Sequence, residues 1–137
     1  MASDADLHRC TVLVVDDDPE LRNVLALALE TSGFRVLTAS NGREALHRLR
    51  SLPDICAVML DVLMPVMDGA MFRETQLRDR SLRGIPIVAM TGAPEGVERA
   101  RAIAAAALLR KPLDFDEVRE TLGRLCRQTN GRGGPPP

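Results

Sequence analysis

The segment TVLVVDDDP, residues 11–19, joins an apolar run to three consecutive acids and a proline. The Val and Leu residues of Thr11–Val15 predict a buried strand. Asp18 before Pro19 is typical of a helix N-cap followed by the first helical residue. The segment therefore predicts a strand that leads through an acidic turn directly into a helix.

The same order of strand and helix repeats along the rest of the chain. Further strands are predicted at Arg35–Ala39, Ala57–Leu60, Ile85–Met90 and Ala107–Arg110. Helices with apolar residues at helical spacing are predicted from Pro19 to Gly33, from Asn41-Gly42 to Pro53, from Asp68-Gly69 toward Arg80, from Pro94 to about Ala105, and after Asp114. This alternation predicts an α/β fold, with a five-stranded parallel sheet covered on both faces by helices. Ligands of such sheets bind at the carboxyl ends of the strands.

Length and composition fit one globular domain. The chain has 137 residues, of which 45% are apolar and 27% charged, with a net charge of −1. We expect a tail at residues 1–10, one domain at 11–128, and a Gly/Pro-rich tail at 129–137. The three aromatic residues are all Phe, so the stacking platforms of single-strand nucleic-acid binders are missing.

The cysteines and the apolar runs indicate a cytoplasmic protein with no membrane partner. Cys10, Cys56 and Cys126 are odd in number and widely spaced, which fits neither a disulfide framework nor a paired zinc-ligand motif. The first ten residues lack the apolar core of a signal peptide, and the longest apolar run, Ala102–Leu109, is too short to cross a bilayer.

Polar side chains follow four of the five predicted strands. Asp16 and Asp17 follow the first, Asp61 the third, Thr91 the fourth and Lys111 the fifth. Carboxylates this close together repel by about 4 kcal/mol per pair at 4 Å and an effective dielectric constant of 20, unless a cation lies among them. Oxygen ligands suit Mg²⁺, with Mn²⁺ as a substitute, and a lysine and a hydroxyl beside the cation would stabilise a phosphoryl group in transfer.

Each of these residues also has a simpler interpretation. Asp18 is better explained as a helix cap than as a ligand. Asp16 and Asp17 could be solvated loop charges, Thr91 a turn residue and Lys111 an exposed strand-end lysine. Their joint placement at one edge of the sheet is what favours a site.

The sequence resembles the receiver domains of response regulators, the phosphorylated switches of bacterial two-component systems. The resemblance covers about Thr11–Cys126. It rests on four motifs in order: VVDDDP at 14–19, LDVLMPVMDG at 60–69, MTG at 90–92 and RKP at 110–112. It implies a flavodoxin-like (βα)5 fold, doubly wound, with strand order 2-1-3-4-5.

The resemblance also implies roles for the strand-end residues. Asp61 would be the phosphoacceptor, and Asp16, Asp17, Asp61 and the backbone carbonyl of Leu63 would hold Mg²⁺. Thr91 would bond the phosphoryl oxygen, Lys111 would pair with it, and the Lys111-Pro112 peptide bond would be cis. The domain would catalyse only its own phosphorylation and dephosphorylation.

Partners follow from the same resemblance. A sensor histidine kinase or phosphotransfer protein would supply the phosphoryl group. Since no second domain is recognised in the sequence, output is expected through protein contacts and not through nucleic acid, from a monomer or weak homodimer. The surface of the fourth helix, fifth strand and fifth helix would carry a basic strip for an acidic partner, made of Arg99, Arg101, Arg110 and Arg119.

Two departures from the family pattern stand out, and two further positions bear on the rate of dephosphorylation. Leu108 occupies the position, three residues before the lysine, where many receivers have the Tyr or Phe of the switch. The segment from Thr91 to Lys111 is two residues shorter than in many relatives. Leu63 and Ala93 occupy the two positions that flank the hydrolytic water in the family, and neither side chain can form hydrogen bonds.

Two enzyme or cofactor-binding classes and one binding module are alternatives to a phosphorylated switch. A phosphatase that uses an Asp-x-Asp pair would need an acid at position 63, which is Leu. A flavin-binding protein of similar topology would need a first loop rich in Ser, Thr and Gly to hold the phosphate, and Asp16 to Asp18 would repel that phosphate. The remaining alternative is a receiver-fold module that binds a partner without phosphorylation, which Leu108 favours slightly and the intact acidic residues disfavour.

Overall fold

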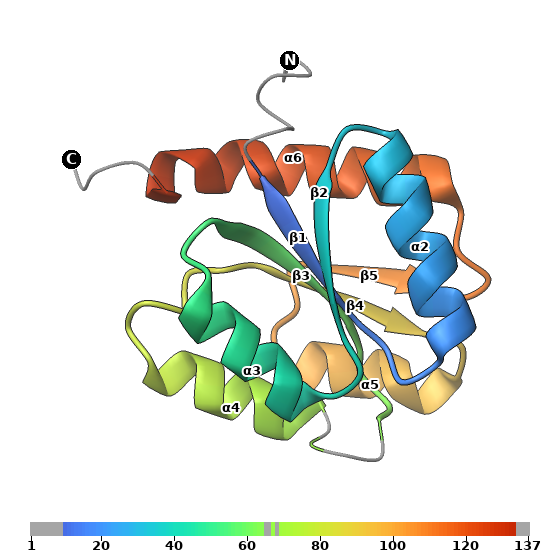
Figure 1. The fold of residues 1–137 in the computed structure, drawn as a ribbon. Helices are drawn as coiled ribbons and strands as arrows, with labels where there is room; N and C mark the ends of the chain where they lie inside the picture. The colour runs from blue at the N-terminus through green and yellow to red at the C-terminus, as the bar shows by residue number, and fades with distance from the viewer. Residues whose placement is uncertain (1–9, 65–66, 68, 134–137) are drawn as a thin grey trace.

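The computed structural model describes residues 10–64, 67 and 69–133, with side chains as far as Arg127. Strands and helices alternate along this part of the chain (Figure 1). The strands are β1 (Thr11–Val15), β2 (Arg35–Ala39), β3 (Ile55–Asp61), β4 (Ile87–Thr91) and β5 (Ala107–Arg110). The helices are α2 (Pro19–Thr31), α3 (Gly42–Ser51), α4 (Gly69–Arg78), α5 (Pro94–Ala102) and α6 (Phe115–Gly133).

The five strands form one parallel sheet in the order β2-β1-β3-β4-β5. The expected fold class and strand order are confirmed. Strand β2 lies on one side of β1 and strand β3 lies on its other side, so the direction of strand order reverses between β1 and β3. Val15 pairs with Ala39 and with Leu60, so these strands end level with one another. The reversal point is where ligands of doubly wound sheets bind.

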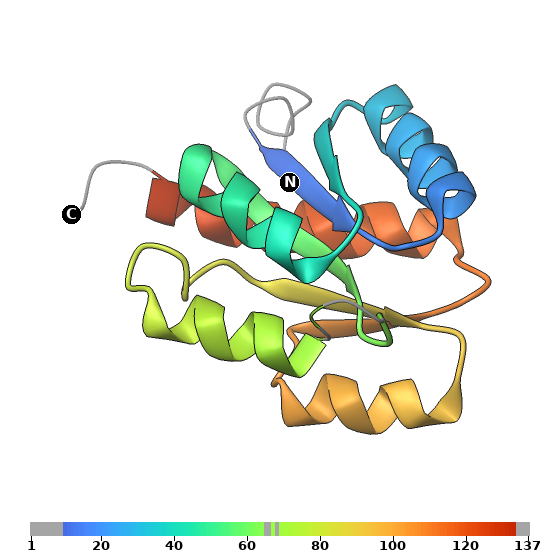
Figure 2. The same ribbon diagram turned by 60° about the horizontal axis from the view of Figure 1, so that its bottom comes forward.

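Helices cover both faces of the sheet. Helices α2 and α6 lie on one face, and α3, α4 and α5 lie on the other (Figures 1 and 2). The alternation of side chains along β1 explains both contacts. Leu13 and Val15 pack in the layer of α3 to α5, whereas Val12 and Val14 pack in the layer of α2 and α6. Strands buried on both faces therefore show the continuous apolar runs seen in the sequence.

The first helix begins as the sequence predicts. The Asp18 carboxylate accepts hydrogen bonds from the backbone N–H groups of Glu20 and Leu21 at 3.0 and 3.4 Å, with Pro19 as the first helical residue. Gly33, just beyond the helix end, has a φ of 103°, which a residue without Cβ adopts at no steric cost. The assignment of Asp18 as the N-cap of this helix is confirmed.

Two strands differ from the prediction at both of their ends. Strand β3 begins at Ile55 and not at Ala57, and it ends at Asp61 and not at Leu60. Strand β4 begins at Ile87 and not at Ile85, and it ends at Thr91 and not at Met90. The buried amide of Gln76 donates to the carbonyls of Leu82 and Ile85 at 2.9 and 2.8 Å, which holds Ile85 in the preceding loop.

Three helix ends differ as well. Helix α4 ends at Arg78, before Arg80. Helix α5 ends at Ala102 and not near Ala105, because Ala104 has a φ of 53°, which a right-handed helix excludes. Helix α6 continues to Gly133, so the backbone of 129–133 is helical where a tail was expected. An existing helix adds each further residue without the cost of nucleation, which outweighs the low helix propensity of its last residues.

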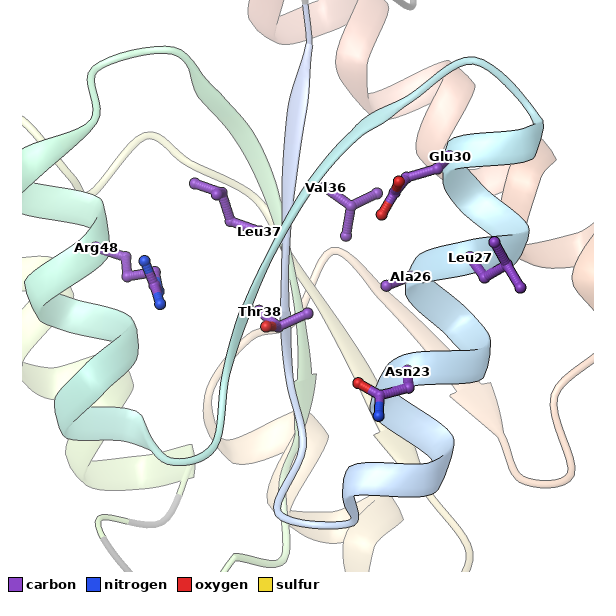
Figure 3. A pocket seen from close by; sticks show the side chains of 8 residues that line it. All are labelled: Asn23, Ala26, Leu27, Glu30, Val36, Leu37, Thr38 and Arg48. Carbon is purple, nitrogen blue, oxygen red and sulfur yellow. The ribbon is translucent and has the colours of Figure 1, made fainter.

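No helix in the described part of the chain combines the length and apolar character that crossing a bilayer requires. A shallow groove runs along the edge strand β2, lined by α2 residues on one side and by Arg48 of α3 on the other (Figure 3). None of the predicted site residues lines this groove.

Candidate functional site

Asp61 is the last residue of β3 and lies at the centre of the candidate site. Its side chain is nearly buried, with the residue 7% exposed. Its Oδ1 accepts a hydrogen bond from the backbone N–H of Leu63 at 3.0 Å, and its Oδ2 lies 3.3 Å from Nζ of Lys111. Burial raises the pKa of Asp61, and the charge of Asp16 adds to this, while the Leu63 N–H and Lys111 oppose it. The ionised carboxylate is therefore held at a cost in free energy.

Asp16 and Asp17 follow β1, on the neighbouring strand. Asp16 is fully buried, and its Oδ1 accepts the backbone N–H of Asp18 at 2.9 Å. The guanidinium of Arg22 donates to the Asp16 carbonyl at 2.8 Å, which fixes the turn. Asp17 is exposed. Carboxylate oxygens of Asp16, Asp17 and Asp61 all lie within 4.8 Å of one another.

Lys111 connects the two buried carboxylates. Its Nζ lies 2.9 Å from Oδ2 of Asp16 and 3.3 Å from Oδ2 of Asp61. Burial alone would lower the pKa of Lys111, but the bond to Asp16 and the charge of Asp61 outweigh it, so the pKa is raised and the side chain stays protonated. The Lys111-Pro112 peptide bond is cis.

Thr91 ends β4, next to Asp61 in the sheet, but its hydroxyl is engaged elsewhere. The backbone N–H of Lys111 donates to the Thr91 carbonyl at 2.9 Å, which ties the ends of β4 and β5 together. The Thr91 Oγ1 donates to the carbonyl of Ala93 and accepts the N–H of Ala93, both at 3.1 Å. Thr91, Ala93 and Lys111 line one cleft at this end of the sheet.

Gly96 was not singled out from the sequence. A Cβ at position 96 would lie 1.8 Å from Oγ1 and 2.4 Å from Cβ of Thr91, so only glycine permits the observed position of Thr91. A glycine early in a predicted helix does indicate close packing, since glycine is unfavourable in a helix unless packing requires it. The sequence alone does not show that the residue packed against Gly96 is Thr91.

The structure also describes the switch position and the two positions expected to flank the hydrolytic water. Leu108 is partly buried and packs against the layer of α3 to α5. Leu63 packs partly buried against the same layer, and Ala93 is likewise partly buried. The motif residues Pro65, Val66 and Asp68 lie outside the described residues.

The charges of the site indicate what it can hold. Three carboxylates and one ammonium give a net charge of −2 within this small volume. The donors are hard oxygens, and one side of the cluster is open to solvent through Asp17. This donor set fits a divalent cation such as Mg²⁺, which prefers carboxylates and keeps some of its water.

Comparisons with known proteins agree with this arrangement. The family model described as response regulator receiver domain matches residues 12–123. The chain is 36% identical over 114 residues to a transcriptional regulatory protein CpxR homolog of Haemophilus influenzae, covering 83% of this chain and 48% of the relative. It is 37% identical over 126 residues to response regulator MprA of Mycolicibacterium vanbaalenii, covering 90% and 53%. The chain thus spans about half the length of these curated relatives.

The fold has solved counterparts. The chemotaxis response regulator CheY4 of Vibrio cholerae superposes with a TM-score of 0.75 at 31% sequence identity, covering 85% of this chain and 98% of that protein. Family model, relatives and fold agree over nearly the whole described sheet. The chain belongs to the response regulator receiver domain family.

Proposed function

We propose that this receiver domain is a phosphoacceptor switch in which Asp61 takes a phosphoryl group from a histidine kinase or phosphotransfer protein. The observation that carries the proposal is the bridge of Lys111 between Asp16 and Asp61 beside a third carboxylate. A solvated loop would not bury an aspartate fully and pair it with a lysine, since such burial requires compensation.

Asp16, Asp17, Asp61 and the backbone carbonyl of Leu63 would hold Mg²⁺, and Mn²⁺ would serve in its place. When bound, the cation would neutralise charge on the phosphoryl oxygens during transfer. Donor chemistry supports this assignment, because the net charge of the cluster equals that of one divalent cation in magnitude.

Asp61, Lys111 and Thr91 each have a different role in the transfer. An Asp61 oxygen attacks the phosphorus, and the donor's leaving group departs on the opposite side. Lys111 stays protonated and pairs with a phosphoryl oxygen, because its ammonium already faces Asp61 Oδ2. Thr91 bonds another phosphoryl oxygen only after its hydroxyl leaves Ala93. That exchange would couple phosphorylation to the start of α5.

Signal output would pass through protein contacts on the face of α5, β5 and α6. Arg99, Arg101 and Arg110 are exposed on α5 and β5. Arg119 is exposed on α6, where it also lines a groove between α2 and α6, so all four arginines belong to the proposed basic strip. Boundaries at residues 11 and 128, a cytoplasmic location and a monomer or weak homodimer remain predictions.

Intact mass spectrometry tests the proposal. The chain is incubated with Mg²⁺ and acetyl phosphate, and the expected result is one added phosphate that Asp61→Asn and a chelator both prevent. Glu30→Ala, which removes an exposed carboxylate at the far end of α2, is the matched control and should be phosphorylated normally. Added phosphate in Asp61→Asn would contradict the assignment.

A further inference from the structure

The three cysteines, far apart in sequence, form one cluster. Cys10 directly precedes β1, Cys56 lies in β3 and Cys126 lies in α6, and their Sγ atoms are all within 4.8 Å of one another. They lie in the core layer between the sheet and helices α2 and α6. Cys10 and Cys56 are at the amino ends of their strands, whereas Asp16 and Asp61 are at the carboxyl ends. The cluster is therefore separate from the phosphorylation site.

An irregularity in β3 contributes to the cluster. Thr11 of β1 pairs with Ile55, but Val12 pairs with Ala57, so Cys56 is an extra residue between two paired positions. As a result, Cys56 and Ala57 pack in the same core layer although they are adjacent. Successive strand residues normally face opposite sides, and bulges of this kind commonly redirect a side chain near a functional site.

The three sulfurs are buried, and the thiols of Cys10 and Cys56 donate hydrogen bonds to backbone carbonyls. Cys10, Cys56 and Cys126 are 0%, 7% and 1% exposed. The Cys10 thiol donates to the Cys126 carbonyl at 3.8 Å, and the Cys56 thiol donates to the Asp54 carbonyl at 3.5 Å. The hydrogen bond with Cys56 and burial raise the pKa of Cys126. Buried thiols of this kind are poor nucleophiles toward oxidants, which disfavours a redox sensor.

The spacing suits three bonds to a common atom. Bonds of about 2.3 Å to a common atom place three coordinating sulfurs about 3.5 to 4 Å apart, with the shorter spacing for a pyramidal centre. The three Sγ atoms already lie within 4.8 Å of one another, so shifts of about 1 Å in each side chain would close the site. Cysteines that serve only as small apolar residues in a core do not require their three Sγ atoms to converge on one point.

Charge decides which atom fits. Three thiolates around a monovalent or divalent ion leave a net negative charge in an apolar layer, which is costly. Structural zinc also takes four ligands, and the described residues provide three sulfurs here. A trivalent ion leaves no net charge. We propose that Cys10, Cys56 and Cys126 form a three-sulfur binding site for a trivalent thiophilic metalloid, with arsenic(III) as the representative.

The binding reaction balances without an oxidant. Arsenious acid, As(OH)₃, is neutral at neutral pH, and it condenses with three thiols. Three As–O and three S–H bonds break, three As–S bonds form, and each thiol proton leaves on a hydroxyl group as water. Arsenic stays trivalent, and no charge is created in the core. Because the thiols are buried, uptake is limited by local opening of the layer under α6 and is accelerated by mild denaturant.

The test uses the whole chain, reduced with a phosphine, and sodium arsenite. The protein is exposed to arsenite both in the native state and during refolding from urea. The second condition makes the thiols accessible, so a negative result cannot be attributed to their burial. Native mass spectrometry should detect one arsenic atom gained and three hydrogens lost, with a higher melting temperature. Absence of that product under both conditions overturns the proposal.

Variants test whether all three sulfurs are ligands. Cys10→Ala, Cys56→Ala and Cys126→Ala should each lose the three-sulfur product and the thermal shift, with circular dichroism reporting whether the fold is kept. Asp61→Asn is the matched control and should bind like the wild type. A full three-sulfur mass change in any cysteine variant, or tighter binding of zinc or copper(I) than of arsenic(III) in competition, would refute the site.

Discussion

Magnesium should raise the stability of this domain by relieving repulsion among the strand-end carboxylates. At an effective dielectric constant of 20, two carboxylate oxygens 4.8 Å apart repel by about 3.5 kcal/mol. Lys111 offsets this for Asp16 and Asp61, at 2.9 and 3.3 Å. Neither contact includes Asp17. With a dissociation constant of about 1 mM, about 10 mM Mg²⁺ stabilises the fold by about 1.4 kcal/mol, or about 5 °C in melting temperature.

The assay is thermal unfolding with and without Mg²⁺. Asp17→Ala should abolish the shift, because it removes the exposed ligand while leaving the buried pair of Asp16 and Lys111 intact. Glu30→Ala should keep the full shift. One outcome would contradict the cation site while keeping the repulsion: the melting temperature of the wild type does not change with Mg²⁺, but Asp61→Asn melts higher than the wild type without metal. The carboxylates would then repel one another without binding a cation.

Four further outcomes follow from the geometry. Lys111→Ala should lose about 3 kcal/mol of stability without Mg²⁺, since buried Asp16 loses its partner, and amide shifts at the start of α5 should no longer respond to phosphorylation. Gly96→Ala should cost about 1–3 kcal/mol in urea unfolding, because its Cβ displaces Thr91; an unchanged midpoint would contradict the packing. Leu63→Asn should dephosphorylate faster than the wild type after donor removal, because a polar side chain can orient the hydrolytic water; equal or slower decay would show that another feature sets the lifetime. The raised pKa of Asp61 means that its protonated form favours folding, so without Mg²⁺ the wild type should lose stability relative to Asp61→Asn as the pH rises above the ordinary value of 3.8.

The order of strands and helices could be predicted from sequence because the two periods of apolar residues alternate clearly. The N-cap at Asp18 and the strands at Thr11–Val15 and Ala107–Arg110 follow from local chemistry. The start of β4 could not be predicted, because it depends on the amide of Gln76 from another helix. The end of α5 depends on the backbone of Ala104, and alanine gives no local signal for a positive φ.

The candidate site was predictable as a set of residue types at strand ends. The sequence could not show that Lys111 bridges two carboxylates, since a lysine at a strand end is as often exposed. It also could not show that the Thr91 hydroxyl is bonded to Ala93 and backed by Gly96. Nor did wide spacing reveal that Cys10, Cys56 and Cys126 meet. Contacts between distant segments arise from packing, which spacing along the chain does not encode.

The most direct measurement of the central claim is chemical trapping of the phosphorylated residue. The chain is phosphorylated with acetyl phosphate and Mg²⁺ and then reduced with borohydride, which converts an aspartyl phosphate to homoserine. Peptide sequencing by mass spectrometry then locates the product. We expect homoserine at position 61 alone. Homoserine at position 16 or 17, or none in a chain that has gained phosphate, would contradict it.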